Sequence, residues 1–271
     1  MLDTIRVALI QPKPYPTFDD PRNIGHALQL LDRCRGEKVD VICFPEYFPY
    51  QGERELAGAA RQHNAYIIAG MVEAEGDHLY NTSTLFDRAG RLLGRQRKRN
   101  VTQVEREHMG ITSGDGIYRA FATDFGKIGI PVGVDFWGQP DSARQLAQQG
   151  VEIVFNSGFF PVLKGHWQTG ALVRAFDNFM DVVGVNSADY NALFQEKRIH
   201  HHGGGSFVIQ PPKMLDKQDF RRWFKSLDSI EDWIQVKLDA LEQVRIAEVY
   251  LGSVRRFREE FRRQFGLGGN A

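Results

Sequence analysis

Short apolar segments alternate with amphipathic segments along most of this 271-residue chain, and this alternation constrains the fold more than any other feature. Strands are expected at residues 5–11, 39–44, 66–72, 80–87, 92–98, 128–134, 151–156, 182–186, 205–209 and 234–238. Helices are expected at residues 23–35, 53–63, 140–149, 167–180 and 252–265. Buried strands that alternate with helices predict an α/β fold in which helices cover the faces of the sheets.

The sequence shows no internal repeat, low-complexity linker or other sign of a domain boundary. We therefore expect one domain over residues 1–271, with a helical tail from about residue 240 to residue 271. The arginine-rich helix expected at residues 252–265 indicates an exposed or subunit-contacting surface in preference to an anion site.

Charge and composition narrow the class of partner. Lysine plus arginine and aspartate plus glutamate both number 34, so the net charge is zero and no global field favours nucleic acid or a membrane surface. The apolar runs are far shorter than the roughly 20 residues that span a bilayer, and the N-terminus has no signal-peptide pattern. The two cysteines, Cys34 and Cys43, favour core packing and a cytoplasmic location over a disulfide framework.

Three residues suited to acid–base chemistry follow predicted elements. Glu46 comes directly after an apolar strand, at the carboxyl end where α/β sheets place their sites. Lys98 ends a predicted hairpin inside a basic run, and Glu105 lies seven residues further on. The alternatives are that Glu46 is a solvated loop carboxylate, that Lys98 belongs to a solvated basic face, and that Glu107 replaces Glu105.

A series of short segments, taken in order, resembles the nitrilase, or carbon–nitrogen hydrolase, superfamily over residues 4–245. They are Gln11-Pro12, Phe44-Pro45-Glu46, Tyr80-Asn81, Arg97-Lys98, Glu105, Ser113-Gly114-Asp115, Asp135, Arg174 to Asn178 and Gly204-Gly205-Ser206, each on the expected element. The resemblance implies a four-layer αββα sandwich that forms a homodimer through helices. It also implies an amide-type or nitrile substrate and no metal or other cofactor.

The resemblance gives each residue a role. Glu46 would be the general base, Lys98 the cation that stabilises the oxyanion of the tetrahedral intermediate, and Glu105 the carboxylate that holds Lys98. A cysteine thiolate would attack the amide or nitrile carbon, because an amide is a poor electrophile that needs an activated nucleophile. This chain departs from the family here, since Gly133 stands at the nucleophile position and no cysteine follows residue 43.

The segment around Gly133 would form the rest of the site. The resemblance makes the backbone N–H of Val134 an oxyanion donor, matches Asp135, and places Phe136 and Trp137 beside the pocket. Ser157, after the next strand, is expected as a polar pocket wall. It could in principle replace the nucleophile, but no adjacent His–Asp pattern supports that role.

The run His200-His201-His202 could bind a metal ion. Three consecutive side chains point in different directions, however, so we expect a loop or the rim of the pocket instead.

Two functions remain open. In the first, the chain acts on a C–N bond without a covalent intermediate, and Glu46 activates water or an amine. In the second, it is an inactive family member that serves as a binding or scaffold subunit. A laboratory substitution at position 133 is a third explanation, although Pro131 and Gly138 also depart from the family pattern.

Overall fold

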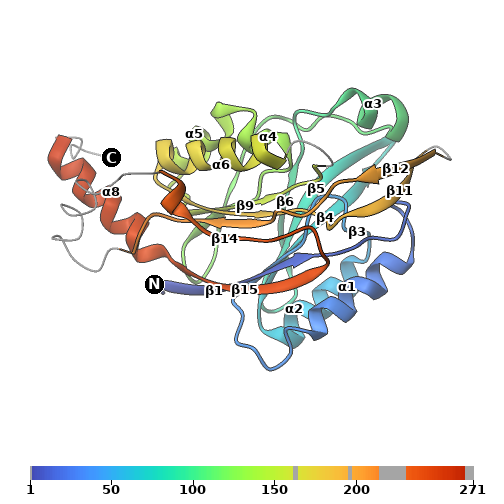
Figure 1. Cartoon of the computed structure of the whole chain (residues 1–271), viewed down its shortest axis with the longest axis horizontal. Coiled ribbons are helices and arrows are strands. Elements are labelled where there is room, and N and C mark those ends of the chain that lie inside the picture. The colour runs from blue at the N-terminus through green and yellow to red at the C-terminus, as the bar shows by residue number, and fades with distance from the viewer. Residues whose placement is uncertain (1, 161–163, 195–196, 214–229, 266–271) are drawn as a thin grey trace.

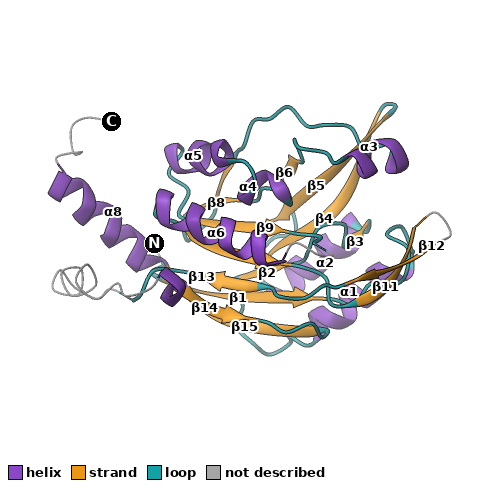
Figure 2. Ribbon diagram, turned by 45° about the horizontal axis from the view of Figure 1, so that its top comes forward, coloured by secondary structure: helices purple, strands orange, loops and turns teal. Residues whose placement is uncertain are grey.

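Two β-sheets pack face to face and carry helices on both outer sides (Figure 1). The computed structural model describes residues 2–160, 164–194, 197–213 and 230–265. Turning the molecule by 45° shows the same layers, with α5 and α6 over one sheet and α1 and α2 beyond the other (Figure 2). The order of layers is therefore helix, sheet, sheet, helix, as expected for an αββα sandwich.

The first sheet has the strand order β15-β1-β2-β4-β5-β6, and β3 pairs with β4. Its strands are β1 (Thr4–Gln11), β2 (Val41–Cys43), β3 (Pro49–Tyr50), β4 (Tyr66–Glu75), β5 (His78–Phe86), β6 (Leu92–Arg97) and β15 (Gln243–Tyr250). Strands β1, β2 and β4 are parallel, so their carboxyl ends meet at one edge of the sheet.

The second sheet has the strand order β14-β13-β10-β9-β8-β7, and β8, β9 and β10 are parallel. Its strands are β7 (Ala120–Ala122), β8 (Lys127–Gly129), β9 (Ile153–Ser157), β10 (Asp181–Val185), β13 (Phe207–Ile209) and β14 (Ile234–Lys237). A separate hairpin consists of β11 (Tyr190–Phe194) and β12 (Lys197–His201).

The helices complete the outer layers. They are α1 (Arg22–Asp32), α2 (Glu53–His63), α3 (Gln103–Met109), α4 (Val134–Trp137), α5 (Pro140–Gln148), α6 (Lys164–Asn178) and α8 (Leu251–Phe265), with a 3-10 helix, η1, at Ile230–Trp233. Helix α3 and the β11–β12 hairpin lie at the same end of the molecule, opposite α8 (Figure 1).

Strand β1 shows why the sequence folds into layers. Ile5, Val7 and Leu9 pack into the core between the two sheets. Ala8 and Ile10, on the other face of the strand, pack against the layer of α1 and α2. Because successive side chains of a strand point to opposite faces, a continuous apolar run fills both cores at once.

Several expected boundaries differ from the structure. The helical tail expected from about residue 240 is wrong for Gln243–Tyr250, which forms β15 and pairs with β1 along its whole length. Alternating exposure in that segment is typical of an edge strand, and the helix begins only at Leu251. The strand expected at 128–134 ends at Gly129 in β8, because Pro131 has no N–H to donate.

The arginines of α8 are more buried than an exposed helix would require. Arg258 donates hydrogen bonds to the backbone oxygens of Val151 and Phe179, and Arg255 pairs with Glu152 at 2.7 Å. These contacts fix the start of α8 to the second sheet, so part of its basic character is structural.

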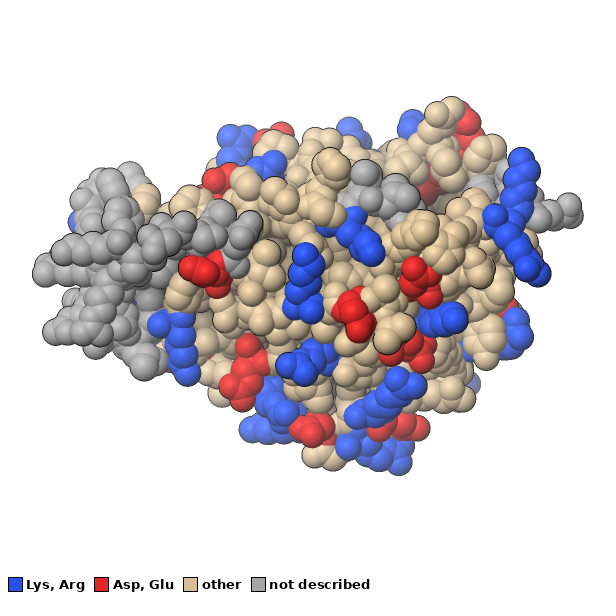
Figure 3. Space-filling model, viewed as in Figure 1, with Lys and Arg blue, Asp and Glu red and all other residues tan. Residues whose placement is uncertain are grey.

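Charged residues mix on the face shown in Figure 3, where lysine and arginine alternate with aspartate and glutamate over the surface. This agrees with the zero net charge of the sequence. In the described ranges of the chain, none of the helices has the length and apolar character needed to cross a membrane.

The contact between α6 and the second sheet leads to a prediction about packing. An added Cβ at Gly184 of β10 would lie 2.4 Å from the Phe207 ring and 2.7 Å from Trp167, both fully buried. We expect Gly184→Ala to lower the free energy of unfolding by about 1–3 kcal/mol, as measured by urea denaturation. Gly165→Ala, on α6 with nothing within 4 Å of the added Cβ, is the control and should not destabilise. Equal stability of the two variants would contradict this packing.

Candidate active site

The three predicted acid–base residues lie together at one end of the sandwich. Glu46 follows β2, Lys98 follows β6 directly, and Glu105 lies in the first turn of α3. The backbone N–H of Lys98 donates to the carbonyl oxygen of Asn81 on β5, which continues the sheet contact past the end of β6. Segments that are distant in the sequence therefore place two carboxylates and one ammonium group at the same edge.

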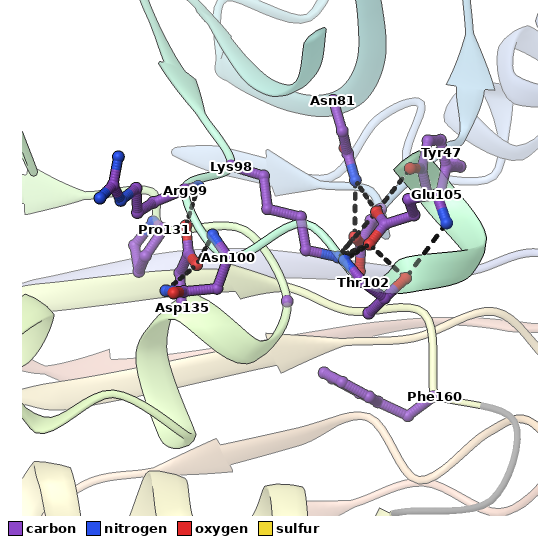
Figure 4. Close-up of polar contacts among 12 residues, drawn as sticks. Tyr47, Asn81, Lys98, Arg99, Asn100, Thr102, Glu105, Pro131, Asp135 and Phe160 are labelled. Atoms are coloured by element: carbon purple, nitrogen blue, oxygen red, sulfur yellow. Dashed lines mark hydrogen bonds and ion pairs between the residues drawn. The ribbon is translucent and has the colours of Figure 1, made fainter. Parts of the chain in front are cut away.

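Lys98 is buried between the two carboxylates (Figure 4). Its Nζ donates to Glu46 Oε1 at 2.8 Å and to Glu105 Oε1 and Oε2 at 2.8 and 2.9 Å. A lysine ammonium has three protons to donate, so all of its donors are directed at carboxylate oxygens. In this arrangement Lys98 organises the carboxylates and keeps no N–H for another acceptor.

Glu105 is held from several sides. Thr102 caps α3, with its hydroxyl and backbone N–H both donating to Glu105 Oε2 at 2.8 Å, while the Glu105 N–H donates back to the hydroxyl. This reciprocal capping box fixes the first turn of the helix. The Tyr47 hydroxyl donates to Glu105 Oε1 at 2.6 Å, and Asn81 Nδ2 donates to both Glu105 and Glu46 (Figure 4).

The environment shifts the three ionisations in different directions. Burial raises the pKa of Glu46, although Lys98 opposes the shift, and the negative charge of Glu105 raises it further. Burial also acts to raise the pKa of Glu105, but the ammonium and hydrogen bonds of Lys98 hold it below its usual value. Burial alone would lower the pKa of Lys98, and the two carboxylates raise it above its ordinary value. Glu46 is therefore the carboxylate of this pair that more readily accepts a proton.

Gly133 lies at the turn between the second sheet and α4, as the sequence predicted. Its φ is +52°, and its ψ is −127°, a conformation that glycine adopts far more easily than residues with a side chain. An added Cβ would lie 2.7 Å from Glu46 Oε2. The carboxylate of Glu46 thus fills the space that the first side-chain atom of a nucleophile at position 133 would need.

The backbone around Gly133 is fixed by buried polar groups. Asn156 Nδ2 donates to the carbonyl oxygens of Pro131 and Gly133, and its Oδ1 accepts from the Trp167 indole at 2.8 Å. Asp135 accepts from the backbone N–H groups of Arg99 and Asn100, and burial raises its pKa. Asp135 therefore ties the loop after Lys98 to α4 (Figure 4).

The N–H of Val134, expected to stabilise an oxyanion, has no hydrogen-bond acceptor within the ranges that the structure describes. A backbone donor in the first turn of a helix without a partner is suited to a developing negative charge.

The cavity beside the cluster has a volume of about 360 Å³, and α3 and the β11–β12 hairpin both contribute to its wall. It is lined by Phe18, Glu46, Tyr47, Lys98, Thr102, Val104, Glu105, Met109, Phe159, Ala192, Ile199 and His201. The charged cluster therefore forms one wall of an otherwise largely apolar space.

This lining includes neither Gly133 nor any of the five predicted substrate contacts, which are Val134, Asp135, Phe136, Trp137 and Ser157. Phe136 is fully buried in the core beneath α5 and α6, and Trp137 packs against Phe160 in the same layer. Ser157 is buried between the sheets, where its hydroxyl donates to the Phe44 carbonyl oxygen at 3.0 Å and accepts from Ser83. The expectation that these three side chains border the pocket is corrected, because each faces a packed core.

The histidine run spans the end of β12, where His200 and His201 lie in the strand and His202 follows it. His201 is buried against Phe159 in the cavity wall, in line with the expected pocket rim, whereas the exposed rings of His200 and His202 lie beside each other. Their ligand atoms and that of Asp189 lie within 4.8 Å of one another, so these three residues could hold a metal ion. Consecutive histidines thus separate into two groups, because side chains alternate along a strand.

Neither cysteine is placed for catalysis. Cys43 is fully buried in the core between the sheets, and burial raises the pKa of its thiol. Cys34 packs beneath the layer of α1 and α2. The prediction that both are core residues is confirmed, and neither thiol lines the cavity.

Sequence reasoning missed Tyr47, Asn81 and Thr102 as parts of the site. Asn81 belongs to one of the segments that suggested the fold, and Tyr47 directly follows Glu46, but no local pattern indicates that their side chains reach Glu105. Thr102 carries a recognisable signal, since threonine three residues before glutamate is the pattern of a capping box. That pattern also favours Glu105 over Glu107, which instead pairs with Gln103 on the exposed side of α3.

Comparison with known proteins shows which family and which solved structures this chain is similar to. The Carbon-nitrogen hydrolase family matches residues 6–212. Omega-amidase NIT2 of Mus musculus is 25% identical over 236 residues, which cover 78% of this chain and 82% of that protein. The carbon-nitrogen hydrolase of Helicobacter pylori G27 superposes with a TM-score of 0.79 at 18% identity, covering 96% of this chain and 93% of the other.

A third protein has a structure that shows a covalent adduct. A mutant of the amidase from Nesterenkonia sp. AN1 superposes with a TM-score of 0.71 at 16% identity, covering 96% of this chain and 97% of that one. That structure shows covalent addition of the acetamide moiety of fluoroacetamide at the active site cysteine.

Two sheets flanked by helices, with a Glu–Lys–Glu cluster at one end, define a protein of the nitrilase type. This chain belongs to the carbon–nitrogen hydrolase family, within the nitrilase superfamily.

The close approach of Glu46 to Gly133 predicts how a side chain would be tolerated there. We expect Gly133→Ala to lower the free energy of unfolding by about 2–4 kcal/mol, because backbone strain adds to crowding of the carboxylate. Gly110→Ala is the comparison, since Gly110 is in the αL region, φ +68° and ψ +21°, and nothing lies within 4 Å of its added Cβ. Urea denaturation of both variants gives the extra loss at Gly133, to which its less favourable backbone conformation and the crowding both contribute, and equal losses would contradict both.

Proposed function

We propose that this protein acts on the C–N bond of an amide-type substrate without a covalent intermediate, with Glu46 as general base. The observation that carries the proposal is the buried cluster of Glu46, Lys98 and Glu105 in the cavity wall, in which both ion pairs measure 2.8 Å. Burying three charges costs stability unless each is paired, and an apolar cluster of similar volume would often be more stable. Such an arrangement is typical of a site that handles protons and charge.

In the proposed reaction Glu46 takes a proton from a water molecule, and the resulting hydroxide attacks the amide carbon. The carbonyl electrons move to oxygen, and the tetrahedral intermediate then collapses as its nitrogen receives the proton from Glu46 and leaves as ammonia or an amine. The products are a carboxylic acid and the free nitrogen compound. Glu46 Oε2 is suited to the first step, because it accepts no hydrogen bond from the described residues.

Lys98 and the Val134 N–H would stabilise the oxyanion in this reaction. When Glu46 becomes protonated it loses its charge, so its ion pair with Lys98 weakens and one N–H of the ammonium can turn to the oxyanion. Proton uptake by Glu46 and charge stabilisation by Lys98 are then linked events. Donors that meet the charge as it develops can contribute about 10²–10³-fold to a rate.

Gly133 favours a second function, in which the protein binds an amide without turning it over. The amidase from Nesterenkonia sp. AN1 has an active site cysteine, whereas this chain has glycine at the position that the family resemblance assigns to the nucleophile. A binding or scaffold subunit would keep the charged cluster to recognise an amide group. The two functions differ in whether any product forms.

Substitution of the base separates these functions. We expect ammonia release from primary amides to fall by about 10²–10⁴-fold in Glu46→Gln, because amide nitrogen and oxygen cannot take up the proton. The measurement is ammonia formed by the unmodified protein and by the variant over a panel of aliphatic amides, N-carbamoyl acids and nitriles.

Glu107→Gln is the control for this comparison, since Glu107 lies on the exposed side of the same helix as Glu105. It should leave ammonia release unchanged. Release that survives in Glu46→Gln would remove Glu46 as the base, and the absence of release from every substrate would favour the binding function.

The raised pKa of Glu46 predicts the pH dependence. Only the ionised carboxylate can act as a base, so kcat/KM should fall as pH decreases through a pKa above the usual 4.5. The pKa of Lys98 is raised above 10.5, so Lys98 should keep its charge, and kcat/KM should not fall for this reason, at any pH below 10.5. A profile of kcat/KM against pH tests the expected fall at acidic pH and the expected absence of a fall at alkaline pH. An acid limb at or below pH 4.5 would contradict the assignment of Glu46 as a buried base.

The homodimer, the cytoplasmic location and a reaction without metal or other cofactor remain predictions. The outer face of α6 supports an association of copies, because Val173 and Phe176 are 39% and 37% exposed there.

A further inference from the structure

The cavity has two chemically different ends. One end carries the charged cluster, and the remaining wall comes from α3, from the β11–β12 hairpin and from two loop phenylalanines. Its apolar side chains are Phe18, Val104, Met109, Phe159, Ala192 and Ile199. Phe18 and Phe159 meet edge to face with ring centroids 5.0 Å apart, which gives this part of the wall a defined shape.

Among the described residues, the lining beyond the Glu46–Lys98–Glu105 cluster contains no lysine, arginine, aspartate or glutamate that could pair with a second substrate charge. Lys98 is already paired with both carboxylates of the cluster. With both carboxylates ionised, the cluster carries one net negative charge. A substrate carboxylate would meet apolar side chains and this negative cluster. Burying an unpaired charge in such surroundings is strongly unfavourable.

His201 offers no accessible donor to a substrate anion. It is 1% exposed and stacks on Phe159 with ring centroids 4.4 Å apart, and both of its ring nitrogens are buried.

We infer that the substrate of this site is an uncharged amide whose acyl chain is aliphatic or aromatic, with the amide group at the Glu46–Lys98 end and the chain between α3 and the β11–β12 hairpin. This inference rests on the proposed function, because it names the substrate class of the same cavity. Amides that carry a carboxylate or an ammonium group at the far end of the chain are excluded by the apolar wall.

Chain length should control binding until the cavity is filled. Transfer of each methylene from water to an apolar wall strengthens binding by about three- to fourfold. The dissociation constants of propanamide, butanamide, pentanamide and hexanamide should therefore decrease in steps of this size. A terminal carboxylate should weaken binding by about tenfold or more relative to a neutral amide of similar length.

The test compares hexanamide with glutaramate and with ε-aminohexanamide, which place an anion or a cation at the far end of a chain of similar length. Ligand-observed NMR titration of the full-length protein gives the dissociation constants, and ammonia release is measured separately. Binding of hexanamide at least about tenfold more tightly than both charged amides supports the inference. Equal or tighter binding of either charged amide overturns it.

A variant that should reverse the preference between charged and neutral amides tests the inference without knowledge of the natural substrate. Ile199 lines the cavity and is 45% exposed, so a longer side chain can be accommodated at its rim. Ile199→Lys should strengthen glutaramate binding by about tenfold or more and weaken hexanamide binding. Ile117→Lys, the same substitution at an isoleucine that is 54% exposed and is not part of the cavity lining, is the control and should change neither. If the Ile199→Lys variant binds glutaramate and hexanamide with the same relative affinities as the unmodified protein, the placement of the acyl chain is contradicted.

Failure of this inference can be distinguished from failure of the proposed function. If neutral amides bind with the expected ranking but release no ammonia, the substrate class stands and the catalytic role of Glu46 fails. If ammonia is released and charged amides bind as well as neutral ones, the catalytic role stands and the substrate class is wrong. If no amide binds, both are wrong.

Discussion

Burial of the Lys98 ammonium between two carboxylates is the interaction on which the rest of the site depends. It joins the segment after β2, the segment after β6 and the first turn of α3, which are otherwise separate pieces of chain. Removing one partner of a buried ion pair typically costs about 3–5 kcal/mol, because the remaining charge has no solvent. Tyr47, Asn81 and Thr102 are supporting donors to the oxygens of the two carboxylates. Lys98 and Asn81 thus hold the carboxylate of Glu46 in place.

Two kinds of sequence pattern predicted parts of this structure: the spacing of apolar residues and the order of short segments along the chain. Continuous apolar runs indicated the buried strands, since β1 fills a core on each face. The order of short segments indicated which strand ends would meet, and Glu46, Lys98 and Glu105 do meet there. Helix α3 was not among the expected helices, although its capping box is local in sequence.

The rest depends on contacts between distant segments that have weak local signals. The β11–β12 hairpin lines the cavity, but Tyr190–Phe194 and Lys197–His201 are short and partly exposed, so their composition does not distinguish strand from loop. Phe136 and Trp137 lie next to the expected nucleophile position, yet their side chains follow α4 into the outer core. Adjacency in sequence does not determine which way a side chain points from a short helix. Ser157 likewise ends β9, and the sheet-to-sheet contact buries its hydroxyl.

The close approach of Glu46 to Gly133 has a consequence for substitutions at position 133. With Glu46 Oε2 only 2.7 Å from where a Cβ would stand, any side chain introduced there would crowd the carboxylate. The other oxygen, Oε1, accepts hydrogen bonds from Lys98 and Asn81, so displacing the carboxylate would also disturb these contacts. A side chain at position 133 and the present position of the Glu46 carboxylate therefore exclude each other.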